Sequence, residues 1–148
     1  MKNIVLFASG NGSNAEEIIN YFKNSENAKV VAIFSNKADA KVLDRAKNHN
    51  IPSVVFSKAQ LNEGFVLEKL QQFQPDLIVL AGFLWKFPSR LLSQFPHVIN
   101  VHPALLPKFG GKGFSPTTQN RLNPMLREIA PKDNRSQSFW FELWINGC

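Results

Sequence analysis

Short, continuous apolar runs restrict the fold of this sequence more than any other feature. Such runs are typical of strands buried on both faces, as in parallel sheets, and here they alternate with segments whose apolar residues recur at helical spacing. Strands joined by helices form right-handed βαβ units. We therefore expect a Rossmann-like α/β fold, an open, mostly parallel sheet with helices on both faces. The expected strands are residues 4–8, 30–34, 54–56, 77–80 and 98–101, and the expected helices are residues 15–22, 40–48, 62–73 and 88–94.

Composition and charge narrow the class of protein. The chain has 148 residues, 44% of them hydrophobic and 19% charged, which are values of one globular domain. Its net charge of +6 comes from Lys and Arg residues that are spread thinly, which favours a solvated surface and an anionic small substrate over nucleic acid. The only cysteine, Cys148, excludes an internal disulfide and argues against a Cys-based metal site. No apolar stretch has the length of a membrane span or the pattern of a signal peptide, so we expect a cytoplasmic protein with no membrane partner.

A glycine-rich turn, Ser-Gly-Asn-Gly-Ser-Asn at residues 9–14, follows the first expected strand and precedes a helix that Asn14 is expected to cap. Glycines such as Gly12 permit positive φ and close approach of the backbone to a ligand. The helix N-terminus offers N–H groups and a partial positive charge, and Ser13 and Asn14 add side-chain donors. The turn lacks the ending of a Walker A loop and the third glycine of a dinucleotide fingerprint. We interpret it as a phosphate site; the alternative is a tight turn without a ligand.

The pair Asn100 and His102 lies where the fifth expected strand ends, and ligands of open α/β sheets bind outside the carboxyl ends of strands. Residues two apart along a strand point to the same side, so both side chains can face one reactive centre. An amide suits a developing oxyanion and a histidine can transfer a proton near neutral pH, which fits acyl transfer. The alternative is that both residues only bond to the backbone. His49 and His97 have no polar companion at useful spacing, so we expect them to be surface or loop residues, and no metal site is expected.

An apolar, aromatic segment at residues 81–87 follows the fourth expected strand and lies at the same sheet edge. It includes Leu84, Trp85, Lys86 and Phe87. Such a segment can line a slot for a flat heterocycle. The alternative is a loop that packs on the core.

With these features in this order, the sequence resembles those of one family, the phosphoribosylglycinamide (glycinamide ribonucleotide) formyltransferases. They are folate-dependent enzymes of purine synthesis. The resemblance covers residues 1–113, and its most specific part is the Asn-x-His-Pro-x-Leu-Leu-Pro pattern. The matching segments are FASGNGSN at 7–14, IFSNKADA at 33–40, PDLIVLAGF at 75–83 and INVHPALLPKFGGKG at 99–113.

The resemblance implies a reaction in which the amine of glycinamide ribonucleotide attacks the formyl carbon of the co-substrate 10-formyltetrahydrofolate. It implies no metal, no nucleic acid, and a monomer or homodimer. It implies that the substrate phosphate is bound by Gly12, Ser13 and Asn14. It implies that the folate is bound by Leu84, Trp85, Lys86, Phe87 and Asn100. It also implies that the formyl oxygen is polarised and the proton is handled by Asn100 and His102.

The sequence after Gly113 departs from this family. There, an aspartate that follows the Lys-Phe-Gly-Gly-Lys-Gly segment orients the catalytic histidine, whereas the acids here, Glu128, Asp133 and Glu142, lie in no matching context. We therefore expect a formyltransferase N-terminal α/β domain at 1–113 and a non-matching segment at 114–148, without buried strands and either frameshifted or poorly ordered. The fold would then be C-terminally incomplete. Losing an orienting carboxylate costs about 10⁴-fold in the serine-protease triad, so we expect weak or absent formyl transfer.

Other functions are also compatible with these residues. A non-catalytic phosphate- or nucleotide-binding remnant would have no acid within hydrogen-bond reach of His102. A formyltetrahydrofolate hydrolase or a transfer-RNA formyltransferase shares the Asn-x-His segment but usually differs at the glycine-rich turn. Nucleic-acid binding rests on net charge alone.

Overall fold

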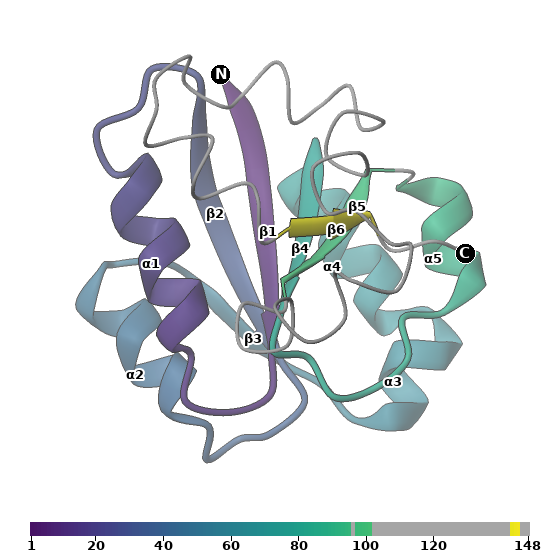
Figure 1. The fold of residues 1–148 in the computed structure, drawn as a ribbon. Helices are drawn as coiled ribbons and strands as arrows, with labels where there is room; N and C mark the ends of the chain where they lie inside the picture. The colour runs from purple at the N-terminus through teal and green to yellow at the C-terminus, as the bar shows by residue number, and fades with distance from the viewer. Residues whose placement is uncertain (96, 102–142, 146–148) are drawn as a thin grey trace, which may run out of the picture.

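The structure is a computed structural model, and it describes residues 1–95, 97–101 and 143–145. These residues form a six-stranded sheet in the order β3-β2-β1-β4-β5-β6 (Figure 1). Strands β1 to β5 are parallel, and β6 is antiparallel to β5. The strands are β1 Lys2–Ala8, β2 Ala28–Ser35, β3 Ser53–Val55, β4 Leu77–Ala81, β5 Val98–Val101 and β6 Leu143–Ile145.

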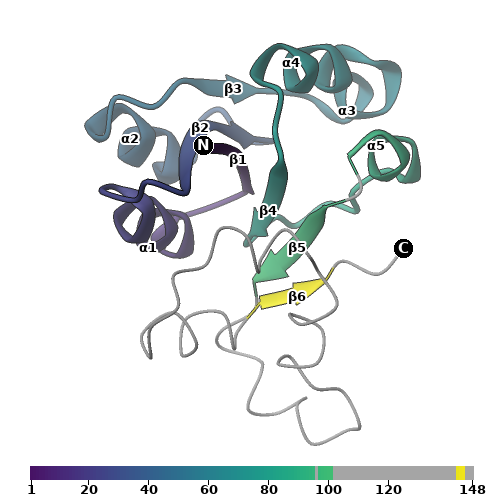
Figure 2. The ribbon, with the colours of Figure 1, turned by 90° about the horizontal axis from the view of Figure 1, so that it is seen from above.

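Helices cover both faces of the sheet, α1 and α2 on one face and α3, α4 and α5 on the other (Figure 2). The helices are α1 Ser13–Phe22, α2 Lys41–Asn48, α3 Lys58–Glu63, α4 Phe65–Phe73 and α5 Ser89–Gln94. The predicted Rossmann-like class, with a mostly parallel sheet between two helical layers, is confirmed. No helix in the described part of the chain is long and apolar enough to cross a membrane.

The central strand β1 explains why the apolar runs are continuous. Ile4 and Leu6 pack in the cluster that contains the buried faces of α1 and α2, whereas Val5 and Phe7 pack in the cluster formed with α3, α4 and α5. Successive residues of a strand point to opposite faces, so a strand covered on both sides needs apolar residues at every position.

The helix predicted at residues 62–73 is confirmed at Phe65–Phe73, but its first two residues belong to a separate helix, α3. Gly64 has a φ of 112°, a left-handed conformation that ends α3 and precedes α4. The first helix begins earlier than predicted, since Ser57 and Gln60 form a capping box in which each side chain bonds the other residue's backbone N–H.

Strand β6 was not predicted, because no strand was expected after residue 113. Its residues pair with β5 in antiparallel register, Leu143 with Val101 and Ile145 with Ile99. The other predictions about residues 114–148, and His102 itself, lie outside the described residues.

The order of the strands creates a topological switch point beside β1. The chain runs outward from β1 through β2 to β3, then crosses back so that β4 pairs with the other side of β1. The loops that leave the carboxyl ends of β1 and β4 therefore turn toward opposite faces of the sheet. In open α/β sheets, ligands bind in the crevice that such a divergence opens.

Candidate functional site

The glycine-rich turn leaves β1 at this switch point and enters α1 through Gly12, whose φ is 82°. A Cβ on Gly12 would lie 2.5 Å from Cγ2 of Val42 in α2, so no side chain fits there. The prediction that Asn14 caps α1 is wrong: Gly12 is the N-cap, and no side chain makes the cap bond. The left-handed glycine lets the helix begin two residues earlier, which places Ser13 and Asn14 in its first turn. The exposed Ser13 and the half-buried Asn14 thus lie where α1 presents its first N–H groups.

The segment after β4 is anchored by aromatic packing. Phe83 and Phe87 contact Phe7 of β1 with ring centroids 5.4 and 5.3 Å apart. Leu84 is 72% exposed, whereas Phe87 is only 3% exposed. Phe87 is therefore a core side chain that can reach a ligand only through its backbone, and Leu84, with the half-buried Trp85 and the exposed Lys86, forms the accessible surface of the loop.

Ser9, which sequence reasoning did not single out, joins the two loops. Its N–H donates to the carbonyl of Gly82 (3.2 Å), and its Oγ accepts the N–H of Leu84 (2.9 Å). The residue is 1% exposed, so these bonds are shielded from water. Ser9 thereby fixes the distance between the glycine-rich turn and the loop after β4.

Replacing Ser9 with alanine is expected to lower the free energy of unfolding by about 1–2 kcal/mol, because the N–H of Leu84 loses its buried acceptor. Urea denaturation measures the total change, and hydrogen exchange at the Leu84 amide measures the local one. Ser93→Ala is the matched control, since Ser93 is exposed and its hydroxyl only donates to the Arg90 carbonyl within α5. Equal stability losses in the two variants would contradict the coupling role of Ser9.

Asn100 lies in β5, in register with Leu80 of β4. Val98 packs on the face covered by α3, α4 and α5, and Ile99 packs on the opposite face. Alternation along the strand therefore places Asn100 on the same face as the aromatic loop after β4. It is half-buried, as expected for an amide that remains accessible at a strand end. His102, its predicted companion, lies outside the described residues.

A hollow of about 460 Å³ lies between α3 and the loop after β4. Leu84 and Trp85 form its apolar side, and Lys58 and Lys86 add two cationic groups. Beside it, a guanidinium N–H of Arg90 donates to the Asn62 carbonyl (2.6 Å) and ties α5 to α3. The hollow combines apolar and cationic surface, which suits an extended, partly aromatic anion.

A polar cluster lies on the other side of the glycine-rich turn, where α1 and α2 meet. Arg45 of α2 donates from Nε to the Asn11 carbonyl (2.7 Å) and from Nη2 to Asn11 Oδ1 (2.6 Å), and it forms an ion pair with Glu16 of α1. His49 Nε2 lies 3.2 Å from Glu16 Oε1. The prediction that His49 has no polar companion is therefore wrong, because its partner comes from a helix distant in sequence.

The charge state of Glu16 follows from these neighbours. The hydrogen bond with His49 and the positive charge of Arg45 lower the pKa of Glu16 from its ordinary value, against the opposing effect of desolvation. Glu16 is therefore an anion at neutral pH. Among the described residues, no three His, Cys, Asp or Glu side chains gather as metal ligands.

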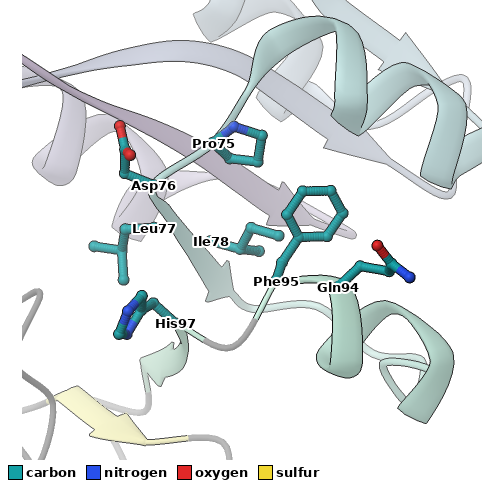
Figure 3. A pocket seen from close by; sticks show the side chains of 7 residues that line it. All are labelled: Pro75, Asp76, Leu77, Ile78, Gln94, Phe95 and His97. Carbon is teal, nitrogen blue, oxygen red and sulfur yellow. The ribbon is translucent and has the colours of Figure 1, made fainter.

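A second hollow, of about 150 Å³, opens at the opposite, amino edge of the sheet (Figure 3). Asp76 and His97 both line it and bond to neighbouring strands: Asp76 Oδ2 accepts the N–H of Asn3 (2.7 Å), and the backbone carbonyl of His97 accepts the N–H of Ile78 (3.0 Å). This hollow is remote from the switch point, and His97 is a loop residue as predicted.

The fold is that of an α/β protein whose loops cluster at a topological switch point, the place where ligands of open α/β sheets bind. The sequence model of the formyl transferase family matches residues 2–122. The chain therefore belongs to the formyl transferase family.

Several relatives of the chain are phosphoribosylglycinamide formyltransferases. It is 37% identical over 116 residues to phosphoribosylglycinamide formyltransferase of Escherichia coli K12, covering 74% of this chain and 55% of the relative. It is 38% identical over 120 residues to the chloroplastic phosphoribosylglycinamide formyltransferase of Arabidopsis thaliana, covering 76% and 41%. The chain thus spans about half the length of these curated relatives.

A solved structure agrees with this placement. The chain superposes on glycinamide ribonucleotide transformylase 1 from Geobacillus kaustophilus with a TM-score of 0.65 and 33% identity, covering 78% of this chain and 70% of the other. The fold of this chain is therefore similar to the fold of that enzyme.

Proposed function

We propose that this protein takes part in formyl transfer from 10-formyltetrahydrofolate to the amine of glycinamide ribonucleotide, a step of purine synthesis. The observation that carries the proposal is the meeting of three segments at one switch point: the glycine-rich turn, the loop after β4, and the end of β5. Ser9 holds the first two together through its bonds to Gly82 and Leu84. A cytoplasmic location and a monomer or homodimer belong to the same proposal.

The glycine-rich turn is the proposed site of the substrate phosphate. Gly12, Ser13 and Asn14 surround the N-terminus of α1, where unpaired N–H groups and the helix dipole attract anions. The tight packing of Gly12 on Val42 keeps this N-terminus at a fixed position relative to α2.

The loop after β4 is the proposed border of the folate. Leu84, Trp85 and Lys86 are accessible to a flat ring, and Phe87 contributes through its backbone. The adjoining hollow, with Lys58 and Lys86 on its lining, complements the carboxylates of the folate's glutamate end.

Replacing Lys58 and Lys86 together with methionine is expected to weaken folate binding about fivefold, since each exposed charge pair contributes about 0.2–1 kcal/mol. Quenching of tryptophan fluorescence measures the dissociation constant. The exposed lysines Lys41 and Lys47 of α2 provide a control pair with the same change of charge. An equal loss of affinity in the control pair would show that net charge, and not this hollow, attracts the folate.

Asn100 and His102 are the proposed groups for chemistry. As the substrate amine attacks the formyl carbon, a C–N bond forms and the carbonyl oxygen gains negative charge. The amide N–H of Asn100 donates to that oxygen. His102 takes the proton from the attacking nitrogen and then gives it to N10 of the folate, as the carbonyl re-forms and the bond between the formyl carbon and N10 breaks.

The 148-residue chain is proposed to transfer formyl slowly, because no acid after Gly113 corresponds to the family's orienting aspartate. These acids are Glu128, Asp133 and Glu142. The expected deficit is about 10⁴-fold, as for loss of the orienting carboxylate in the serine-protease triad. Near-normal turnover in a formyl-transfer assay would contradict this part of the proposal.

The test of the whole proposal is calorimetric titration of the protein with glycinamide ribonucleotide and with glycinamide riboside, which lacks the phosphate. Binding of the ribonucleotide with a clear loss of affinity for the riboside is expected. Absence of ribonucleotide binding would refute the proposal. Tight ribonucleotide binding with no formyl transfer during long incubation at high protein concentration would identify a binding module in place of an enzyme.

A further inference from the structure

Arg45 of α2 makes two hydrogen bonds with the glycine-rich turn. Its guanidinium reaches both oxygens of Asn11, the backbone carbonyl from Nε at 2.7 Å and Oδ1 from Nη2 at 2.6 Å. Its remaining nitrogen pairs with the Glu16 carboxylate. A planar fork with several donors in fixed positions is the feature that distinguishes arginine from lysine. One side chain therefore connects the turn, α1 and α2.

Glu16 presents a problem for an anion site. It lies in the first turn of α1, and its backbone N–H donates to the carbonyl of Gly12 (2.8 Å), so it lies one turn from the proposed phosphate position. A carboxylate in a first turn favours the helix, but it also repels a second anion at the same end. The Glu16 side chain is 31% exposed, so this repulsion is only partly screened by water.

We propose that Arg45 is the positioning residue of the phosphate-binding turn: it holds Asn11 in place and neutralises Glu16, so that the N-terminus of α1 accepts a phosphate dianion. This inference rests on the proposed function, since it assigns a role in binding the phosphate of glycinamide ribonucleotide. Arg45 acts through the turn and through Glu16. The first effect is geometric, and the second is electrostatic.

The two effects can be separated by substitution. Arg45→Met keeps the aliphatic stem but removes both effects, and it is expected to weaken ribonucleotide binding about tenfold, the value of one strong charge-assisted hydrogen bond. Adding Glu16→Gln to Arg45→Met removes the carboxylate that Arg45 no longer neutralises, so part of the affinity is expected to return. Lys47→Met is the matched control, because it removes the same charge from an exposed position of the same helix. Its expected effect is less than about twofold.

Two single variants distinguish a positioning role from simple anchoring of α1 to α2. Asn11→Ala removes the Oδ1 acceptor of an exposed residue without changing charge, and we expect about threefold weaker binding. Glu16→Gln breaks the ion pair but removes the repelling charge, so binding is expected to be unchanged or tighter. If Arg45 only anchored the helices, Glu16→Gln would weaken ribonucleotide binding, as Arg45→Met does. These two variants also decide the question if Arg45→Met does not fold.

The experiment is calorimetric titration of each variant with glycinamide ribonucleotide, with folate binding followed by tryptophan fluorescence to confirm that the loop after β4 is intact. Weaker ribonucleotide binding in Arg45→Met and Asn11→Ala, with unchanged folate binding and no loss in Glu16→Gln, is the expected result. Wild-type affinity in Arg45→Met, or a loss in Glu16→Gln equal to that in Arg45→Met, would overturn the inference alone. Failure of the unmodified protein to bind the ribonucleotide would overturn the proposed function as well.

Discussion

Replacing Gly12 with alanine is expected to lower the free energy of unfolding by about 3 kcal/mol and to abolish binding of glycinamide ribonucleotide. The φ of 82° costs an L-residue about 1–2 kcal/mol, and the added methyl group overpacks a full site at a further cost of about 1–3 kcal/mol. The new Cβ would lie 2.5 Å from Val42 Cγ2 and 2.8 Å from Val42 Cα, so rotation of the valine side chain cannot remove the clash. Either α1 or α2 must move, and the phosphate position moves with them.

Gly10→Ala is the matched control for this prediction, since it makes the same substitution in the same turn. A Cβ on Gly10 meets no atom within 4 Å, and Gly10 is not among the described glycines with positive φ. It is expected to leave stability unchanged or to raise it by up to about 1 kcal/mol. Urea denaturation of the two variants measures the difference. Equal stabilities would show that the close packing of Gly12 on Val42 is not required.

A double-mutant cycle with Val42 measures how much of the cost of Gly12→Ala comes from the clash with the valine Cγ2. Val42→Ala alone creates a cavity in the fully buried core, so it destabilises the protein. In the Gly12→Ala background the same change also removes the nearest clashing atom, so its cost is expected to be smaller. Additive effects of the two substitutions would show that the contact with Val42 Cγ2 does not contribute to the cost of Gly12→Ala.

The strands were predictable from sequence because the physical cause of their pattern is local. In β1, every residue from Ile4 to Ala8 is fully buried, so no polar residue interrupts the apolar run that predicts the strand. Helix boundaries were less predictable. Phe65 to Phe73 has helical periodicity, but the break at Gly64 depends on one backbone angle that periodicity does not encode. The capping box of Ser57 and Gln60 was a local pattern that marks the start of α3 and could have been recognised.

Some residues of the candidate site could likewise be predicted from the sequence, and others could not. The glycine-rich turn and Asn100 could be placed at one sheet edge from the order of strands and turns alone. Ser9 and Arg45 could not be found, because their partners lie far away in the chain: Leu84 is 75 residues from Ser9, and Asn11 is 34 residues from Arg45. Only the folded topology brings such pairs together, since β4 pairs with β1 and α2 packs beside α1.

The two loops at the switch point lie on opposite faces of the sheet, and each is proposed to hold a different ligand. The glycine-rich turn enters α1 on one face, whereas the loop after β4 packs through Phe83 and Phe87 on the other. A substrate held by its phosphate at α1 and a folate held beside Trp85 would therefore approach each other across the ends of β1 and β4. In the proposed function, Asn100 would contact the formyl group that passes between them, because it lies on the folate side of β5.

Replacing Asn100 with alanine is expected to slow formyl transfer by about 10²–10³-fold, the cost of removing one donor from an oxyanion site. The amide makes its strongest bond when the formyl oxygen becomes negative, so the loss falls on the transition state and not on the bound substrate. Binding of glycinamide ribonucleotide, which depends on the turn at α1, is expected to change less than about threefold. Single-turnover transfer with protein in excess measures the rate even for a slow catalyst, and calorimetry measures the binding.

Asn20→Ala provides the control for this measurement, because Asn20 is an exposed asparagine in the last part of α1, away from the carboxyl edge of the sheet. It should leave both the transfer rate and the binding unchanged. A rate for Asn100→Ala within a few fold of the control would remove Asn100 from the chemistry and leave it as a strand-end residue that bonds to the backbone. A parallel loss of ribonucleotide binding would instead place Asn100 in substrate recognition, since uniform binding energy lowers KM without raising kcat.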